Sequence, residues 1–212
     1  MGLYSEDQWL AWVDRLSEDD YVIIDHFISD EVYQMARSFL AERLEEDRFS
    51  KAGIGPASEQ QIISEIRGDY IYWLDKHRDT RLQEFFDLLE ETIWVLNRYC
   101  YLSLSGFEFH LAHYPSGSYY KKHLDQFKSR NNRMISMIIY LNEDWKEGDG
   151  GELKIYKPSG DILVQPLARR CILFKSDTVE HEVLLTHVSR YSLTGWLLYL
   201  PSSVGSVMGS SY

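Results

Sequence analysis

Three stretches in the first hundred residues repeat apolar side chains with helical spacing. They cover residues 5–16, residues 30 to about 46 after Ser29, and residues 79 or 80 to about 98. Each stretch carries a single apolar stripe, which is typical of an amphipathic helix that packs on a sheet. Ser29 has the side chain that caps helix N-termini, so we expect the second helix to begin at Asp30.

The pattern changes at Gly106, where apolar and polar residues begin to alternate in short runs. We expect strands near residues 106–114, 119–123, 133–142, 151–156, 161–164, 170–175, 179–184 and 189–199. Turn-forming residues separate several of these runs, as in Pro115-Ser116-Gly117 and Pro158-Ser159-Gly160. Short strands at this spacing predict a sandwich or jelly roll, so the fold class is mainly β with supporting α.

The remaining segments complete a single structural domain. Residues 21–27 and the segment IRGDYIYWLD from Ile66 onward read as further strands, the latter with a charged pair, Arg67 and Asp69. Residues 51–64 lack an apolar period and contain Gly53, Gly55 and Pro56. They form either a mobile surface loop or a lid that closes on substrate. We expect residues 201–212 to be a flexible tail.

The triplet His123-Leu124-Asp125 is the strongest chemical signal in the chain. On a strand, residues i and i+2 face the same side, so an imidazole and a carboxylate could meet one metal ion there. His181 is the best candidate for a third ligand, and two histidines with one carboxylate suit Fe(II) in non-haem oxygenases. The alternative is a surface histidine beside a solvated aspartate.

Arg190 lies nine positions after His181 on a strand-like run, and this spacing favours the metal interpretation. Arg190, Thr194 and Trp196 share one strand face, and an even-length turn would place His181 on that face as well. A buried arginine needs an anion, so an arginine inside a barrel invites a carboxylate ligand. By contrast, His110 and His113 point to opposite faces of their strand, so both cannot bind one ion.

Composition and charge exclude several classes of protein. With 44% hydrophobic and 14% aromatic residues among 212, the chain is globular. A net charge of −11 disfavours nucleic acid as a partner. No apolar run is long enough for a membrane span, and the first residues lack a signal-peptide pattern. Two cysteines without metal-type spacing lead us to expect a reduced, cytoplasmic protein. The oligomeric state has no signature in the sequence.

Taken together, these motifs carry a family resemblance. From about Asp19 to Leu200 the chain resembles the prolyl 4-hydroxylase branch of the 2-oxoglutarate/Fe(II)-dependent dioxygenases, and within it the oxygen-sensing prolyl hydroxylases and their bacterial relatives. The motifs that match are HYPSGSYYKKHLD, IIYLNEDW, RYSLTGW and IRGD, together with the arginine nine positions after the distal histidine. The family fold implies a double-stranded β-helix at residues 106–200, buttressed by helices, the substrate loop at about 51–64 and supporting strands within residues 1–105.

The resemblance also implies roles for individual residues. His123, Asp125 and His181 would bind Fe(II), and Arg190 would anchor 2-oxoglutarate. Further co-substrate contacts would come from Tyr114, Ile138, Tyr140, Thr194 and Trp196. Substrate contacts would come from Arg67, Asp69, Tyr120, Arg133 and Trp196. Dioxygen is the second co-substrate, and ascorbate is the candidate reductant.

The activity implied is 4-hydroxylation of a proline in a protein substrate. For a bacterial chain the resemblance points to the translation GTPase elongation factor Tu. Two alternatives remain at this point. One is an oxygenase of the same fold that acts on a free amino acid, a small metabolite or a nucleic-acid base. The other is a non-catalytic sensing or binding module that keeps the barrel.

Overall fold

A computed structural model describes residues 4–53, 66–126 and 131–199 of the chain. Three helices and a short 3₁₀ turn lie in its first half: α1 (Glu6–Asp19), α2 (Asp30–Glu45), η1 (Thr80–Leu82) and α3 (Gln83–Cys100). Ser5 and Ser29 cap α1 and α2 by accepting from the main-chain N–H of Gln8 and Val32. The predicted helices are therefore present, although the third begins with a 3₁₀ turn and α1 runs three residues further than expected. Within the described residues, no helix has the length and apolar character needed to cross a membrane.

Eleven strands are described. Those before Gly106 are β1 (Tyr21–Ile24), β2 (Ser50–Lys51) and β3 (Tyr70–Trp73), and those after it are β4 (Gly106–Tyr114), β5 (Tyr120–His123), β6 (Arg133–Tyr140), β7 (Leu153–Ile155), β8 (Ile162–Val164), β9 (Cys171–Lys175), β10 (His181–Val183) and β11 (Arg190–Leu198). The eight runs predicted from Gly106 onward correspond to β4 to β11. The strand β2 was not predicted, because its two residues pair with β3 without any alternating pattern of their own.

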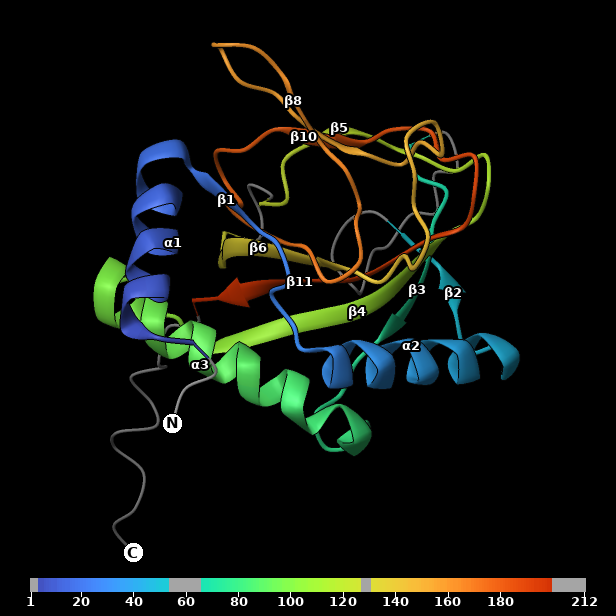
Figure 1. The fold of residues 1–212 in the computed structure, drawn as a ribbon, viewed down its shortest axis with the longest axis horizontal. Coiled ribbons are helices and arrows are strands. Elements are labelled where there is room, and N and C mark those ends of the chain that lie inside the picture. Colours follow the sequence, from blue (N-terminus) through green and yellow to red (C-terminus); the bar gives the residue numbers. More distant parts are fainter. Residues whose placement is uncertain (1–3, 54–65, 127–130, 200–212) are drawn as a thin grey trace, which may run out of the picture.

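The strands form two antiparallel sheets that lie face to face (Figure 1). The larger sheet has the order β1-β9-β6-β11-β4-β3-β2, and the smaller one has the order β5-β10-β7-β8. Non-consecutive neighbours within each sheet are the connectivity of a jelly roll. The predicted mainly-β jelly-roll class with supporting helices is therefore confirmed.

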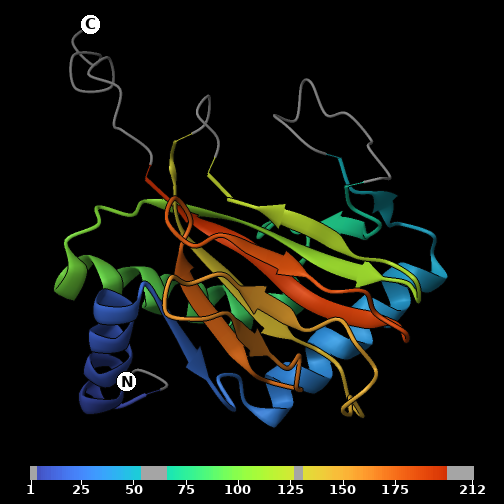
Figure 2. The same ribbon diagram turned by 90° about the horizontal axis from the view of Figure 1, so that it is seen from above.

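Helices cover the outer face of the larger sheet, where α2 and α3 run beneath it (Figure 1). Seen from above, α1 packs at one end of that sheet beside β1 (Figure 2). One apolar core fills the layer between helices and sheet, and includes Phe85, Leu89 and Phe109. A second core lies between the sheets and includes Ile138, Leu153 and Phe174. The helices thus hold the larger sheet from outside and leave its inner face to the site.

Two local expectations were wrong. The strand β5 ends at His123, so Asp125 lies beyond it and not on a shared strand face. His181 and Arg190 belong to different sheets, so they face one another across the interior and do not share one strand face. Apolar alternation could not distinguish these cases, because it gives the orientation of side chains within a strand and not the sheet that the strand joins.

Part of the predicted substrate loop, residues 54–64, and the predicted tail at 201–212 lie outside the described residues.

Candidate active site

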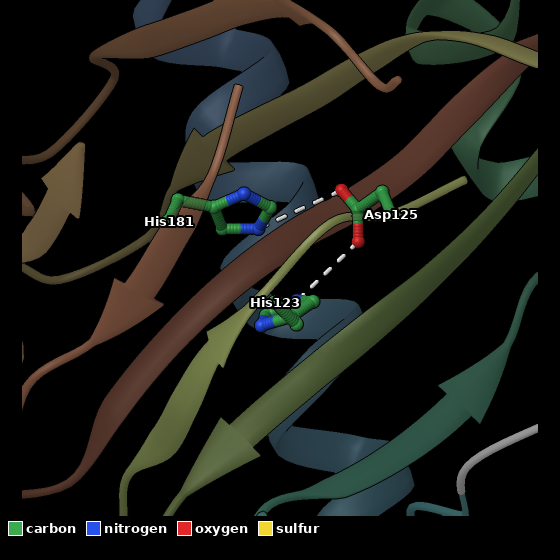
Figure 3. A group of neighbouring side chains, drawn as sticks. All are labelled: His123, Asp125 and His181. Carbon is green, nitrogen blue, oxygen red and sulfur yellow. Dashed lines mark ion pairs between the residues drawn. The ribbon is translucent and has the colours of Figure 1, made fainter. Parts of the chain in front are cut away.

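Two histidines and one aspartate meet between the sheets (Figure 3). His123 ends β5, Asp125 follows it by two residues, and His181 begins the neighbouring strand β10. The register pairs His123 directly with His181. One possible ligand atom from each of the three residues lies within 4.8 Å of the others. Residues 58 positions apart in the chain are therefore brought together by a single strand pairing.

Hydrogen bonds fix the orientation of both imidazoles. Nδ1 of His123 lies 2.8 Å from the carbonyl oxygen of Lys121, and Nδ1 of His181 lies 3.0 Å from that of Val179. Each Nδ1–H therefore donates to the main chain, which leaves a lone pair on each Nε2. Those Nε2 atoms lie 3.5 Å and 3.7 Å from the two carboxylate oxygens of Asp125.

Asp125 is held as an anion. Burial alone would raise the pKa of this carboxyl, but the neighbouring His181 and His123 and the hydrogen bond from Ser136 together lower it below its usual value. Ser136 donates to one carboxylate oxygen at 2.6 Å and also contacts the Ser176 hydroxyl at 2.8 Å. Burial lowers the pKa of His181 to about 4. Neutral imidazoles and an ionised carboxylate are the protonation states that metal binding requires.

Arg190 is a buried cation whose hydrogen-bonding capacity is only partly used. Its side chain, on a residue that is 2% exposed, donates from Nε to the carbonyl oxygen of Gly151 at 2.8 Å. Its guanidinium lies 5.0 Å from the ring centroids of both Tyr114 and Tyr140. Buried Nη2 of Arg190 and the buried hydroxyl of Tyr140 have no hydrogen-bond partner. Unsatisfied buried donors of this kind fit a bound carboxylate.

Gly151 allows Arg190 to lie where it does. The glycine has a φ of +76°, and a Cβ there would come within 2.9 Å of Cδ of Arg190. The same Cβ would lie 3.0 Å from the hydroxyl oxygen of Thr186. Any larger residue would therefore push against the arginine, and no pattern in the sequence indicates this contact.

A charged pair, Arg67 with Asp69, lies beside the cavity. Arg67 donates to both oxygens of Asp69, at 2.7 Å and 2.6 Å, and its guanidinium lies 4.4 Å from the ring centroid of Tyr120. On the opposite side Arg133 stacks over Trp196 at 3.3 Å and donates to the carbonyl oxygen of Asp125 at 3.3 Å. The Arg67–Asp69 pair and Arg133 thus lie close to the metal-binding group.

One cavity collects most of the residues predicted for the site. Its lining includes Arg67, Tyr114, Tyr120, His123, Asp125, Arg133, Ile138, His181, Arg190, Thr194 and Trp196. Tyr140 and Asp69 are not part of this lining. Both are fully buried and contact the lining residues Arg190 and Arg67.

Sequence reasoning missed part of this lining. Trp73, Ile71, Leu153 and Val183 were not singled out, because each reads as an ordinary core residue of a strand. His110, which the sequence places on the face of its strand opposite to His113, also lines the cavity.

The residues present fit an Fe(II) ion and a dicarboxylate. Two imidazoles and one carboxylate face the same cavity, and this ligand set is the one that suits non-haem Fe(II) oxygenases. Among the described residues this is the only group of three or more such side chains that could hold a metal ion.

Comparison with known proteins agrees with this chemistry. Residues 109–198 match the model of the 2OG-Fe(II) oxygenase superfamily. The chain is 27% identical over 197 residues to the hypoxia-inducible factor prolyl hydroxylase of Caenorhabditis elegans, covering 86% of the chain and 27% of the relative. It is 30% identical over 161 residues to human Egl nine homolog 1, covering 67% of the chain and 37% of the relative. The chain thus spans well under half the length of these curated relatives.

Two solved structures resemble the whole chain. A prolyl-4-hydroxylase from Pseudomonas putida has a TM-score of 0.82 and 31% identity, over 91% of this chain and 100% of the other. A prolyl hydroxylase from Trichoplax adhaerens, solved with a peptide of the hypoxia-inducible factor oxygen degradation domain, has a TM-score of 0.84 over 93% and 94%, at 24% identity. The second similarity shows the fold alone.

Proposed function

We propose that this chain, which belongs to the 2OG-Fe(II) oxygenase superfamily, is an Fe(II)- and 2-oxoglutarate-dependent dioxygenase. Its substrate would be a protein, in which it hydroxylates C4 of a proline. The observation that carries the proposal is the joint geometry of the triad and Arg190 in one cavity. The identity of 31% with the Pseudomonas putida prolyl-4-hydroxylase over that protein's full length supports the choice of proline.

His123, Asp125 and His181 would hold the iron, which when bound supplies dioxygen activation driven by the oxidative decarboxylation of 2-oxoglutarate. Ser136 and the main-chain carbonyls of Lys121 and Val179 keep the three ligands oriented before the metal arrives. Such supporting contacts commonly affect metal affinity by an order of magnitude or more.

Arg190 and Tyr140 would bind the distal carboxylate of 2-oxoglutarate. Unpartnered Nη2 and the phenol hydroxyl each supply one donor, and the Nε bond to Gly151 prevents the guanidinium from turning away. Tyr114 stays a phenol, because burial raises its pKa well above the usual value. Thr194, Ile138 and Trp196 line the same wall and would position the rest of the co-substrate.

Arg67, Asp69, Tyr120, Arg133 and Trp196 would contact the protein substrate. Burial lowers the pKa of Arg67, but the bond to Asp69 outweighs this effect and keeps the guanidinium charged. The pair is therefore a fixed ionic unit stacked on Tyr120. Because these side chains are already fixed, a peptide can bind to them without the entropy loss of ordering long side chains.

Elongation factor Tu is the specific substrate that we propose for a bacterial chain. The resemblance to bacterial members of the branch supports this choice. We propose the cytoplasm as the compartment, where Cys100 and Cys171 would stay reduced as free thiols. Ascorbate is the proposed reductant for iron that becomes oxidised without turnover.

The test is succinate formation by purified protein with Fe(II) and 2-oxoglutarate, with and without a pool of lysate proteins. We expect succinate to rise with the protein pool, and mass spectrometry to find one protein that gains one oxygen on a proline. Succinate that rises only with a small-molecule fraction would favour a metabolite oxygenase. No succinate from iron-loaded protein under any condition would favour a binding module and contradict the proposal.

A further inference from the structure

His110 lies in the wall of the active-site cavity. It pairs with Trp73 of β3 on one side and with Thr194 of β11 on the other. Its ring centroid lies 4.9 Å from the ring of Trp73 and 5.7 Å from that of Trp196. The residue is 3% exposed and lines the same cavity as the triad. The two indole rings lie 6.3 Å apart, so the imidazole packs against both of them in one cluster of three rings at the site itself.

The imidazole is polar, yet one of its ring nitrogens has no partner among the described residues. Nδ1 of His110 is buried and has no hydrogen-bond partner. Burial and the nearby Arg67 guanidinium lower the pKa of His110 to about 3, so the ring is neutral and keeps one acceptor nitrogen. An unsatisfied buried acceptor costs free energy that phenylalanine would avoid at similar size. A bound ligand that donates a hydrogen bond would remove that cost.

Trp196 supplies the complementary group. Its buried Nε1–H has no acceptor, and Arg133 stacks on the ring at 3.3 Å and fixes its plane. A free acceptor and a free donor on neighbouring rings match what a peptide main chain presents, N–H and C=O. A metabolite carboxylate would satisfy only the indole and would leave the imidazole acceptor without a donor.

We propose that His110 determines specificity by accepting a hydrogen bond from the substrate main-chain N–H that follows the target proline, while Trp196 donates to a main-chain carbonyl. This inference rests on the proposed function. The target proline itself has no N–H, so the nearest donor belongs to the next residue. A second proline at that next position is therefore rejected.

The test uses a synthetic library of peptides with one central proline. The member that gains oxygen fastest with the wild-type enzyme is remade with an ester in place of the amide after the proline, which removes the N–H. A matched control peptide carries the ester in place of the amide three residues further along the chain. Dissociation constants are measured under anaerobic conditions with enzyme that holds Fe(II) and 2-oxoglutarate, so the readout is independent of turnover.

Wild-type enzyme should bind the first ester about fivefold to tenfold more weakly than the amide, and the matched ester about as well as the amide. His110→Phe should bind the amide as weakly as wild type binds the first ester, with no further loss on the ester. His110→Asn, which keeps a polar group near the Nδ1 position, should recover most of the affinity. His113→Phe, on the opposite face of β4, is the matched control and should bind like wild type.

Equal loss on the first ester in wild type and His110→Phe would overturn the inference, as would equal binding of both esters by wild type. The wild-type comparison of the two esters decides even if His110→Phe fails to fold, which thermal melting would reveal. If no library peptide gains oxygen while iron and 2-oxoglutarate bind, the proposed function fails and this inference fails with it.

Discussion

At the scale of single residues, the site consists of buried polar side chains that are oriented before any ligand binds. Both metal-facing imidazoles donate to main-chain carbonyls, and Asp125 accepts from Ser136. Arg190 is oriented by Gly151 in the same way. Orientation of this kind lets the ligands bind without further ordering of the protein, which is how such sites achieve affinity.

Replacing Asp125 should remove metal binding. In Asp125→Ala the two imidazoles remain, but the only anionic group of the triad is lost. We expect the affinity for Fe(II) to fall more than about a hundredfold and succinate formation to disappear. Metal content after dialysis measures this directly, with Asp177→Ala, an exposed aspartate outside the cavity, as the control. Stoichiometric iron in Asp125→Ala would show that the ligand set is wrong.

Replacing Gly151 should weaken 2-oxoglutarate binding through Arg190. The new Cβ of Gly151→Ala would lie 2.9 Å from Cδ of Arg190 and displace the guanidinium. We expect the KM for 2-oxoglutarate to rise about tenfold, against about a hundredfold in Arg190→Ala, because a charge-assisted bond contributes about 1.5–3 kcal/mol.

Gly148→Ala provides the matched control for backbone strain. Gly148 also has a positive φ, +95°, but a Cβ there meets nothing within 4 Å. Its variant should carry a similar loss of stability and a wild-type KM for 2-oxoglutarate. A KM that rises equally in both glycine variants would show that strain alone is responsible.

At the scale of elements, buried contacts between β3 and the start of α3 set the position of the sheet edge that carries Trp73. Asp79 is 4% exposed and accepts from the Tyr72 hydroxyl at 3.0 Å, the Asp75 N–H at 2.8 Å and the Arg78 guanidinium. The carboxylate thereby ties the end of β3 to the turn before the helix.

Asp79 should make stability depend on pH. Burial alone raises its pKa, but the bonds from Arg78, Asp75 and Tyr72 outweigh burial and lower the pKa below 3.8. A carboxyl with a lowered folded-state pKa stabilises the protein above the unfolded-state pKa, and this contribution is lost as pH falls through the folded-state pKa. Asp79→Asn should therefore lower the free energy of unfolding by about 1–2 kcal/mol at pH 7, and by less below about pH 4.

Denaturant unfolding between pH 3 and pH 7 measures this difference. Asp87→Asn removes the same charge at an exposed position of α3 and should change stability by less than about 0.5 kcal/mol throughout. A difference for Asp79→Asn that stays constant down to the lowest pH would contradict the account.

Individual elements were readily predicted from the sequence, and their assembly was less so. Residues 106–114 alternate clearly and form β4 at those bounds. Sheet membership could not be predicted, because His181 and Arg190 have the same local pattern and yet lie in opposite sheets. The first two residues of the triad were found because His123 and Asp125 lie only two positions apart in the sequence. Gly151 and His110 were missed as functional residues, since their roles depend on contacts with Arg190 and with two tryptophans from other strands.

At the scale of the whole molecule, helices cover the outer face of the larger sheet and the smaller sheet faces its inner side (Figures 1 and 2). Arg190 comes from the larger sheet, and His123 and His181 come from the smaller one. Closing the sandwich is therefore what assembles the site.

The central claim is that this site transfers one atom of dioxygen to a proline while the other enters succinate. The most direct measurement is turnover under ¹⁸O₂ with a substrate protein from the lysate pool, followed by mass spectrometry of both products. We predict one ¹⁸O atom on C4 of a single proline and one ¹⁸O atom in succinate, in equal amounts. Labelled succinate without labelled proline, or label on another residue or on a small molecule, would contradict the account.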